Sequence, residues 1–86
     1  AFREISDLLS ARSALAKQLR SATANKNSQE KRLEIAQARF SAGLISYLEV
    51  LDSQRELVAA ENTSVQVRRA QLDSASQLYK ALGGGE

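Results

Sequence analysis

Apolar residues recur along this chain at alternating spacings of four and three, in two long stretches separated by a short break. In the first stretch, nine of the twelve positions in such a series are apolar. The series comprises Ala1, Ile5, Leu8, Arg12, Leu15, Leu19, Ala22, Lys26, Gln29, Leu33, Ala36 and Phe40. A heptad repeat of this length is typical of a coiled-coil helix. We therefore expect one long helix over residues 1–42.

A second series predicts another long helix over residues 47–82, with eight of eleven positions apolar. It comprises Tyr47, Leu51, Gln54, Val58, Glu61, Val65, Arg68, Leu72, Ala75, Tyr79 and Leu82. This series is the predicted seam with the first helix. A further apolar set lies beside it: Val50, Leu57, Ala60, Val67, Leu78 and Ala81. One antiparallel partner needs one seam, so this set indicates another neighbouring helix, or it widens the face toward the first helix.

Gly43 lies in the break between the two stretches, in a chain without proline whose other glycines all follow residue 82. Glycine ends helices easily because it reaches the left-handed conformation at little cost. Ser46 and Glu49 then fit a capping box, and Ile45 and Val50 are spaced as a hydrophobic staple. The chain is predicted to reverse at residues 43–46.

The predicted fold class is all-α: a long antiparallel two-helix coiled-coil hairpin. Each arm of roughly 40 residues should be about 60 Å long. The second helix is expected to end at Leu82, and residues 83–86, with three glycines, should form a flexible tail. A two-helix rod has little interior, so we expect partners. We also expect the isolated chain to self-associate as an antiparallel four-helix bundle.

Charge and composition narrow the function classes. The chain has no Cys and no His, which removes disulfides, thiolate chemistry, histidine bases and the usual zinc ligands. We predict no enzyme activity, no metal site and no cofactor. Residues 1–42 carry eight bases and four acids, whereas residues 43–86 carry four and six, so opposite charges favour pairing of the arms. The basic residues form no dense stripe, so we expect no nucleic-acid binding.

Membrane insertion is not expected of this segment. No stretch approaches the roughly 18 apolar residues that a membrane-spanning helix needs. Residues 1–20 carry charges throughout, unlike a signal peptide.

Two large aliphatic residues, Leu44 and Ile45, stand at the predicted turn. A turn that only reverses the chain favours polar residues. Since Ile45 can serve the staple, Leu44 remains as a candidate docking residue, unless it folds back over the end of the hairpin. Glu49, Asp52 and Glu56 follow on the second helix. These acids are either a solvated face or a functional acidic patch near the tip.

Four segments resemble the C-terminal region of TolC-type outer-membrane efflux proteins, especially the multidrug and metal efflux branch. They are residues 38–43 (Ala-Arg-Phe-Ser-Ala-Gly), residues 46–55, residues 78–85 and the opening residues 1–9. The resemblance is carried in particular by the arginine–aromatic–x–x–glycine turn, the following Leu-Glu-Val-Leu-Asp run and the terminal Leu-Gly-Gly-Gly in combination. The likeness covers nearly the whole chain.

The resemblance implies a homotrimeric channel whose helical barrel crosses the periplasm below an outer-membrane β-barrel, in a Gram-negative bacterium. The chain would be one hairpin of that α-barrel and part of a longer subunit. Its turn would meet a periplasmic adaptor (membrane fusion) protein, which connects the channel to an inner-membrane transporter. The implied docking turn comprises Ala42, Gly43, Leu44, Ile45 and Ser46.

Glu49 and Asp52 align with acidic positions that, in some relatives, ring the closed aperture and favour cations. Ile45 stands where some relatives have an arginine that braces the closed state, so the resemblance does not extend to that interaction. The alternative function is a free-standing coiled-coil interaction hairpin, such as the arm of an adaptor or scaffold protein.

Overall fold

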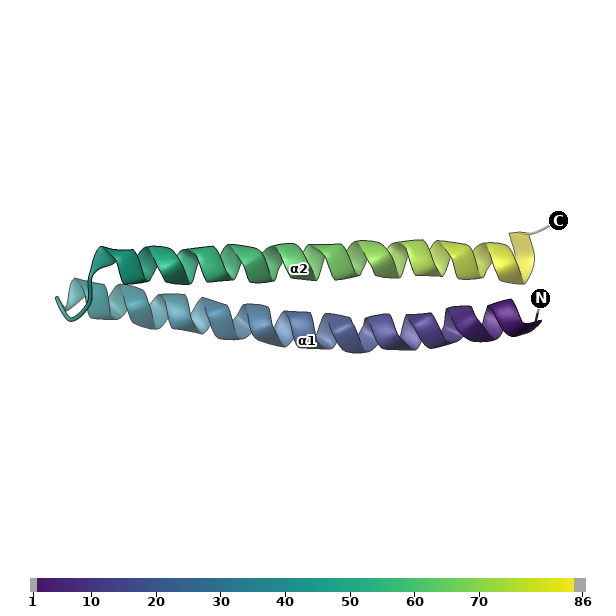
Figure 1. Ribbon diagram of the computed structural model, residues 1–86, viewed down its shortest axis with the longest axis horizontal. Coiled ribbons are helices and arrows are strands. Elements are labelled where there is room, and N and C mark those ends of the chain that lie inside the picture. The colour runs from purple at the N-terminus through teal and green to yellow at the C-terminus, as the bar shows by residue number, and fades with distance from the viewer. Residues whose placement is uncertain (1, 85–86) are drawn as a thin grey trace.

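The structure, a computed structural model, describes residues 2–84 as a helical hairpin. Helix α1 spans Phe2–Ser41 and helix α2 spans Tyr47–Tyr79. The two helices lie side by side and antiparallel, with both ends of the chain at the same end of the rod (Figure 1). The molecule measures 65 × 17 × 12 Å. The predicted all-α hairpin is confirmed.

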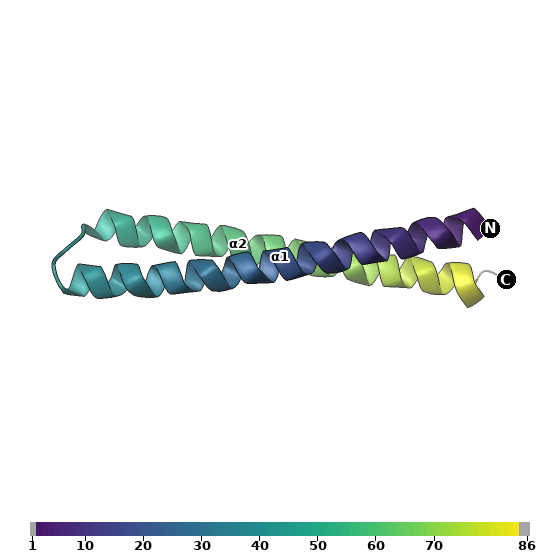
Figure 2. The same ribbon diagram turned by 90° about the horizontal axis from the view of Figure 1, so that it is seen from below.

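The helices wind around each other rather than run straight. After a quarter turn of the view about the long axis, α1 crosses α2 near the middle of the rod (Figure 2). Such winding keeps the side chains of a heptad seam against the partner helix over the whole length.

The end of the second arm differs from the prediction. A π-helical turn, η1, spans Lys80–Gly84, so Gly83 and Gly84 continue the helical path that was expected to end at Leu82. Glycine costs about 1 kcal/mol in a helix relative to alanine, but it does not forbid the conformation. Gly85 and Glu86, which complete the predicted flexible tail, lie outside the described residues.

The seam of α1 is the one that its heptad series predicted. Ala22 and Ala36 are buried. Most other members of the series are half-buried: Ile5, Leu8, Leu15, Leu19, Lys26, Gln29 and Leu33. The exceptions are Arg12 and Phe40, which are exposed.

The predicted seam of α2 is wrong. Val50, Ala60, Ser64, Ser74 and Leu78 are the buried residues of this helix. Half-buried Ser53, Leu57, Val67 and Gln71 complete the same series of alternating spacings. All members of the apolar set expected to lie to the side, except the exposed Ala81, therefore pack on α1. Hydrophobicity favoured the wrong series because serine and glutamine hold several positions of the right one.

Small side chains let the two helices approach each other. Ala22 and Ser64 are both buried and stand at equal sequence distances from Gly43, as do buried Ala36 and Val50. Residues equally far from the turn of an antiparallel hairpin lie at the same level. Within residues 2–84, Gln29 Oε1 and Ser74 Oγ are buried without a hydrogen-bond partner, which costs roughly 1–3 kcal/mol for each group. The two helices thus pack closely along the seam, but this packing stabilises the hairpin only moderately.

Substituting one valine on each series distinguishes the two possible seams. Val50 is 2% exposed and Val58 is 53% exposed. We expect Val50→Ala to lower the free energy of unfolding by about 2 kcal/mol, because it leaves a cavity between the helices. Val58→Ala should change it by less than about 0.5 kcal/mol. Urea denaturation monitored by circular dichroism measures both changes in the free energy of unfolding. The protein concentration must be low enough to keep the chain monomeric. A larger effect at Val58 would restore the seam first predicted.

Candidate functional site at the hairpin tip

Helix α1 ends in a Schellman motif built on Gly43. The Gly43 N–H donates to the carbonyl oxygen of Phe40 at 2.9 Å, and the Leu44 N–H donates to that of Arg39 at 2.9 Å. Gly43 has a φ of 77°, in the left-handed region that glycine adopts without strain. These bonds satisfy the last carbonyls of the helix. The turn is therefore a defined structure whose direction is set by backbone hydrogen bonds.

Helix α2 begins after Ser46, whose backbone is extended, with φ −80° and ψ 159°. Ser46 is the N-cap, as predicted, but its side chain makes no capping hydrogen bond. Its backbone carbonyl instead accepts the Glu49 N–H at 3.2 Å. The serine half of the predicted capping box is therefore wrong, and the helix start depends on backbone geometry and on packing.

Leu44 and Ile45 are adjacent but have opposite environments. Ile45, just before the N-cap, is half-buried, and Val50 in the first turns of α2 is buried. These are the positions and the environments that a hydrophobic staple requires. Leu44 is 73% exposed, so it does not fold back over the end of the hairpin. The turn thus uses one aliphatic residue for folding and leaves the other in solvent.

An aromatic pair connects the two helices next to the turn. Phe40 in the last turn of α1 and Tyr47 at the start of α2 have ring centroids 5.2 Å apart, with an interplanar angle of 60°. Such edge-to-face pairs contribute about 0.5–1.5 kcal/mol beyond the area they bury. Both rings nevertheless remain exposed, at 43% and 51%. The pair holds the two helices together and also adds apolar surface to the tip.

Exposed apolar side chains gather at the tip. Five of the twelve large apolar residues that are exposed within the described chain lie between residues 40 and 51. They are Phe40, Leu44, Tyr47, Leu48 and Leu51, which we call the tip surface. The heptad positions of Phe40 and Tyr47 wrongly predicted that these residues lie in the seam and not on the surface. A surface of this kind is typical of a protein interaction site.

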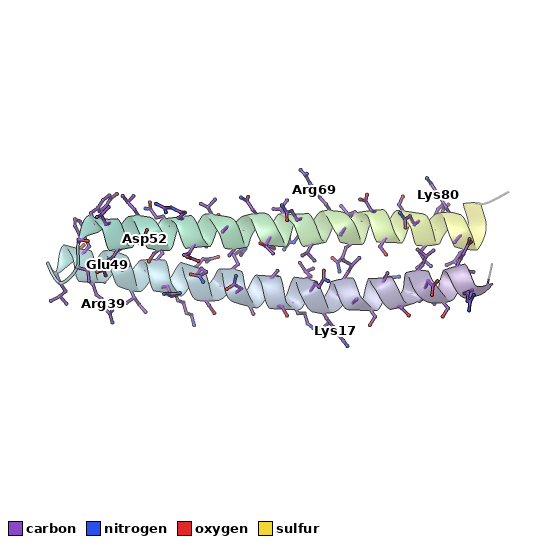
Figure 3. The ribbon with its side chains drawn as sticks, viewed as in Figure 1. Lys17, Arg39, Glu49, Asp52, Arg69 and Lys80 are labelled. Carbon is purple, nitrogen blue, oxygen red and sulfur yellow. The ribbon has the colours of Figure 1, made fainter. Side chains whose placement is uncertain are left out.

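Charged residues line one side of the tip. A shallow groove of about 300 Å³ is lined by Arg32 and Arg39 of α1, by Glu49 of α2, and by Ile35, Ala36, Ile45 and Ser53. Asp52 instead forms an ion pair with Arg55, with Oδ1 of the aspartate 3.9 Å from Nη2 of the arginine. Both side chains are largely exposed. Such an exposed pair adds little stability. Figure 3 shows Arg39, Glu49 and Asp52 at the turn end of the rod, with Lys80 at the opposite end.

The sequence-predicted site residues are thus close together but fall into two groups. Ala42, Gly43, Leu44 and Ser46 are exposed around the turn, and Ile45 is the half-buried member. Glu49 and Asp52 lie in the first turns of α2 with arginines nearby. Among residues 2–84, no cluster of three or more carboxylates is arranged to hold a metal ion. No helix within that range is long and apolar enough to cross a membrane.

Fold and site define a class of protein: a long helical hairpin that presents exposed apolar side chains at its turn. The family model of the outer membrane efflux proteins matches residues 1–84. This chain therefore belongs to the outer membrane efflux protein family. No solved structure matches it.

Similar proteins include the outer membrane proteins of efflux pumps. The chain is 42% identical over 85 residues to the solvent efflux pump outer membrane protein SrpC of Pseudomonas putida, and equally to the toluene efflux pump outer membrane protein TtgI of the same species. It is 35% identical to the probable outer membrane lipoprotein SilC of Salmonella typhimurium. Each alignment covers 99% of this chain and 18% of the relative. The chain thus spans less than a fifth of the length of these relatives.

Two glycine positions test the conformation of the turn. At Gly43 an added Cβ would meet no atom within 4 Å, so substitution there acts only through its positive φ. We expect Gly43→Ala to lower the free energy of unfolding by about 1 kcal/mol, and Gly43→Asn by less, because asparagine tolerates this region. Gly83→Ala is the matched control, since Gly83 has equal space and no positive φ. A destabilisation at Gly83 as large as that at Gly43, in thermal unfolding, would contradict the argument.

Proposed function

We propose that this hairpin is part of the periplasmic α-barrel of an outer-membrane channel subunit in a tripartite efflux pump. Family membership and the whole-chain similarity to efflux pump proteins support this proposal. In this reading the hairpin forms a section of duct wall and carries out no chemistry. The full-length subunit is a homotrimer in the outer membrane of a Gram-negative bacterium, and this segment lies in the periplasm.

The observation that carries the proposal is the exposure of Leu44 on a rigid turn. Backbone hydrogen bonds fix the turn, so exposing a large aliphatic residue there gains nothing for folding. Apolar anchors on preorganised elements are typical of binding sites, because little conformational entropy is lost on binding. We infer that residues Ala42 to Ser46 dock a periplasmic adaptor protein, which links the channel indirectly to an inner-membrane transporter.

The acidic residues beside the tip suggest a second role. Glu49 and Asp52 are one turn apart on α2, close to the end that would face the adaptor. Repeated around a trimer, they would place a ring of negative charge at the periplasmic aperture, which attracts cations. Ile45 adds no positive charge to this ring. Arg55 and the two arginines of the groove offset part of the acidic charge in each hairpin.

The competing function is a free-standing coiled-coil interaction hairpin, such as an adaptor or scaffold arm. It would use the same exposed tip. The match of residues 1–84 to the outer membrane efflux protein family favours the channel subunit.

Adaptor docking is tested by two leucines of equal exposure. Leu44 at the turn is 73% exposed, and Leu72, far from the turn on α2, is 72% exposed. In the full-length channel, we expect Leu44→Ala to weaken binding of the purified adaptor about tenfold and to reduce efflux in cells, because it removes the anchor. Leu72→Ala removes equal apolar area far from the tip and should change binding by less than about twofold. Equal effects, or no effect of Leu44→Ala, would contradict docking by residues 42–46.

The acidic ring is tested by ion selectivity. Replacing both acids, Glu49→Gln with Asp52→Asn, should lower the cation-to-anion permeability ratio of the full-length channel in planar bilayers, because the fixed negative charge is removed. The double variant Glu4→Gln with Asp73→Asn changes the same charge far from the tip and should leave the ratio unchanged. A ratio unaltered by the first pair would exclude the aperture role.

A further inference from the structure

One side of the hairpin is polar from the tip to the middle of the rod. Besides the groove of about 300 Å³ at the tip, a groove of about 480 Å³ lies between α1 and α2 nearer the middle. Residues spaced by seven or fourteen positions on each helix line both grooves on the same side of the seam. They are Gln18, Asn25, Arg32 and Arg39 of α1 with Glu49 and Thr63 of α2, which we call the polar row. All six are exposed.

The other side of α2 is apolar. Glu49 and Thr63 of the polar row each directly precede a buried residue of α2. Leu51 and Val65 each directly follow the same buried residue. Since one residue turns a helix by about 100°, the two sets lie on opposite sides of the seam. The second set belongs to a row of exposed apolar residues seven apart, which we call the apolar row: Leu51, Val58, Val65, Leu72 and Tyr79.

The two sides differ in what they can contact. Of the large apolar residues exposed within residues 2–84, Ile35 is the one that lines either groove of the polar side. The apolar row has exposed fractions from 38% to 76%, and an exposed row of this kind is typical of a surface that another protein element covers. The exposed amides of Gln18 and Asn25 favour water instead, because a covered amide must find new hydrogen-bond partners. The apolar row is thus the side for protein contact, and the polar row is the side for water.

A hairpin with one covered side and one wet side has a defined place in the wall of a duct. If the covering element lay on the inner side, it would fill the passage. The wet side of such a hairpin therefore faces the interior. This step rests on the proposed function, since a free-standing hairpin has no interior side. Glu49 agrees with it, because this acid of the suggested aperture ring belongs to the polar row.

Charge is unevenly distributed along the polar side. The groove at the tip has two arginines and one glutamate in its lining. The middle groove is lined by Gln18, Ser21, Ala22, Asn25, Thr63 and Val67, with Lys17 as its one charged residue. Amides and hydroxyls form hydrogen bonds with water and with solutes of either charge, and they carry no fixed charge that would repel one sign. The middle of this side is therefore nearly neutral, in contrast to the tip.

We propose that the polar row lines the water-filled interior of the duct, and that the neutral middle of this hairpin lets solutes of either charge pass. Asn25 and Thr63 then contact the passing solute, whereas Val65 packs inside the wall. On this hairpin, selection by charge takes place at the tip, where the charged members of the polar row lie.

Two exposed asparagines test which side faces the interior. Asn25 lines the middle groove, and Asn27, two positions on, lies about 200° away around α1. In the full-length channel in planar bilayers, Asn25→Asp should raise the cation-to-anion permeability ratio about 1.5-fold, and Asn25→Lys should lower it by a similar factor, because each adds one charge per subunit to the lining. Salt of about 0.05 M keeps these charges effective beyond roughly 10 Å. Asn27→Asp and Asn27→Lys are the matched controls and should leave the ratio unchanged.

Chemical modification gives an independent readout, since this chain has no native cysteine. Thr63 and Val65 are exposed in the hairpin and lie two positions apart, one on the polar row and one on the apolar row. In a cysteine-free full-length channel, a cationic methanethiosulfonate reagent should modify Thr63→Cys and lower the cation-to-anion permeability ratio. Val65→Cys should react only after the channel is denatured.

The failure of this proposal can be told apart from the failure of the proposed function. In a channel that conducts, a shift at Asn27 but not at Asn25, equal shifts at both, or no shift at either would overturn the interior position of the polar row. Modification of Val65→Cys as fast as Thr63→Cys would also overturn it. A full-length protein that conducts no ions would contradict the proposed function itself, and this inference with it.

Discussion

Close packing of α1 on α2 through small side chains is the constraint on which the rest of this hairpin depends. Buried alanines and serines bring the backbones together, and buried residues at matching distances from Gly43 keep the two helices in register. This seam buries little apolar surface and leaves two polar atoms without partners within the described residues. The hairpin is therefore a thin rod with a defined shape and only a modest interior.

A thin seam has consequences for the outside of the molecule. The seam of α2 combines Val50, Leu57, Val67 and Leu78 with small residues, and the other large apolar residues of α2 remain on its outer side and at the tip. These residues make the rod suited to association along its side and to docking at its end. The exposed apolar residues of α2 follow the length of the helix, and Tyr47 and Leu51 near the turn also belong to the tip surface. In a duct assembled from such rods, side-by-side contacts would build the wall and the tips would remain free for a different protein.

The turn shows how the rod can present its end rigidly. A Schellman motif, an extended N-cap residue and an edge-to-face aromatic pair all act within a few residues of Gly43. None of them needs the side chain of Leu44, which remains in solvent. The family to which the chain belongs is one of outer membrane efflux proteins, and a rigid exposed turn agrees with the docking role proposed for it.

The sequence by itself determined two long helices, the place of the reversal and the seam of α1, because heptad spacing and a lone glycine are local signals. It also indicated Leu44 and Ile45 as the unusual residues of the turn. Only the tertiary structure decided which face of α2 packs on α1. Two heptad series lie one residue apart on that helix, and apolarity selected the larger side chains, whereas close approach of α1 required the series with Ser64 and Ser74. For the same reason the exposure of Phe40 and Tyr47 could not be read from their heptad positions, since those positions do not specify which neighbour is present.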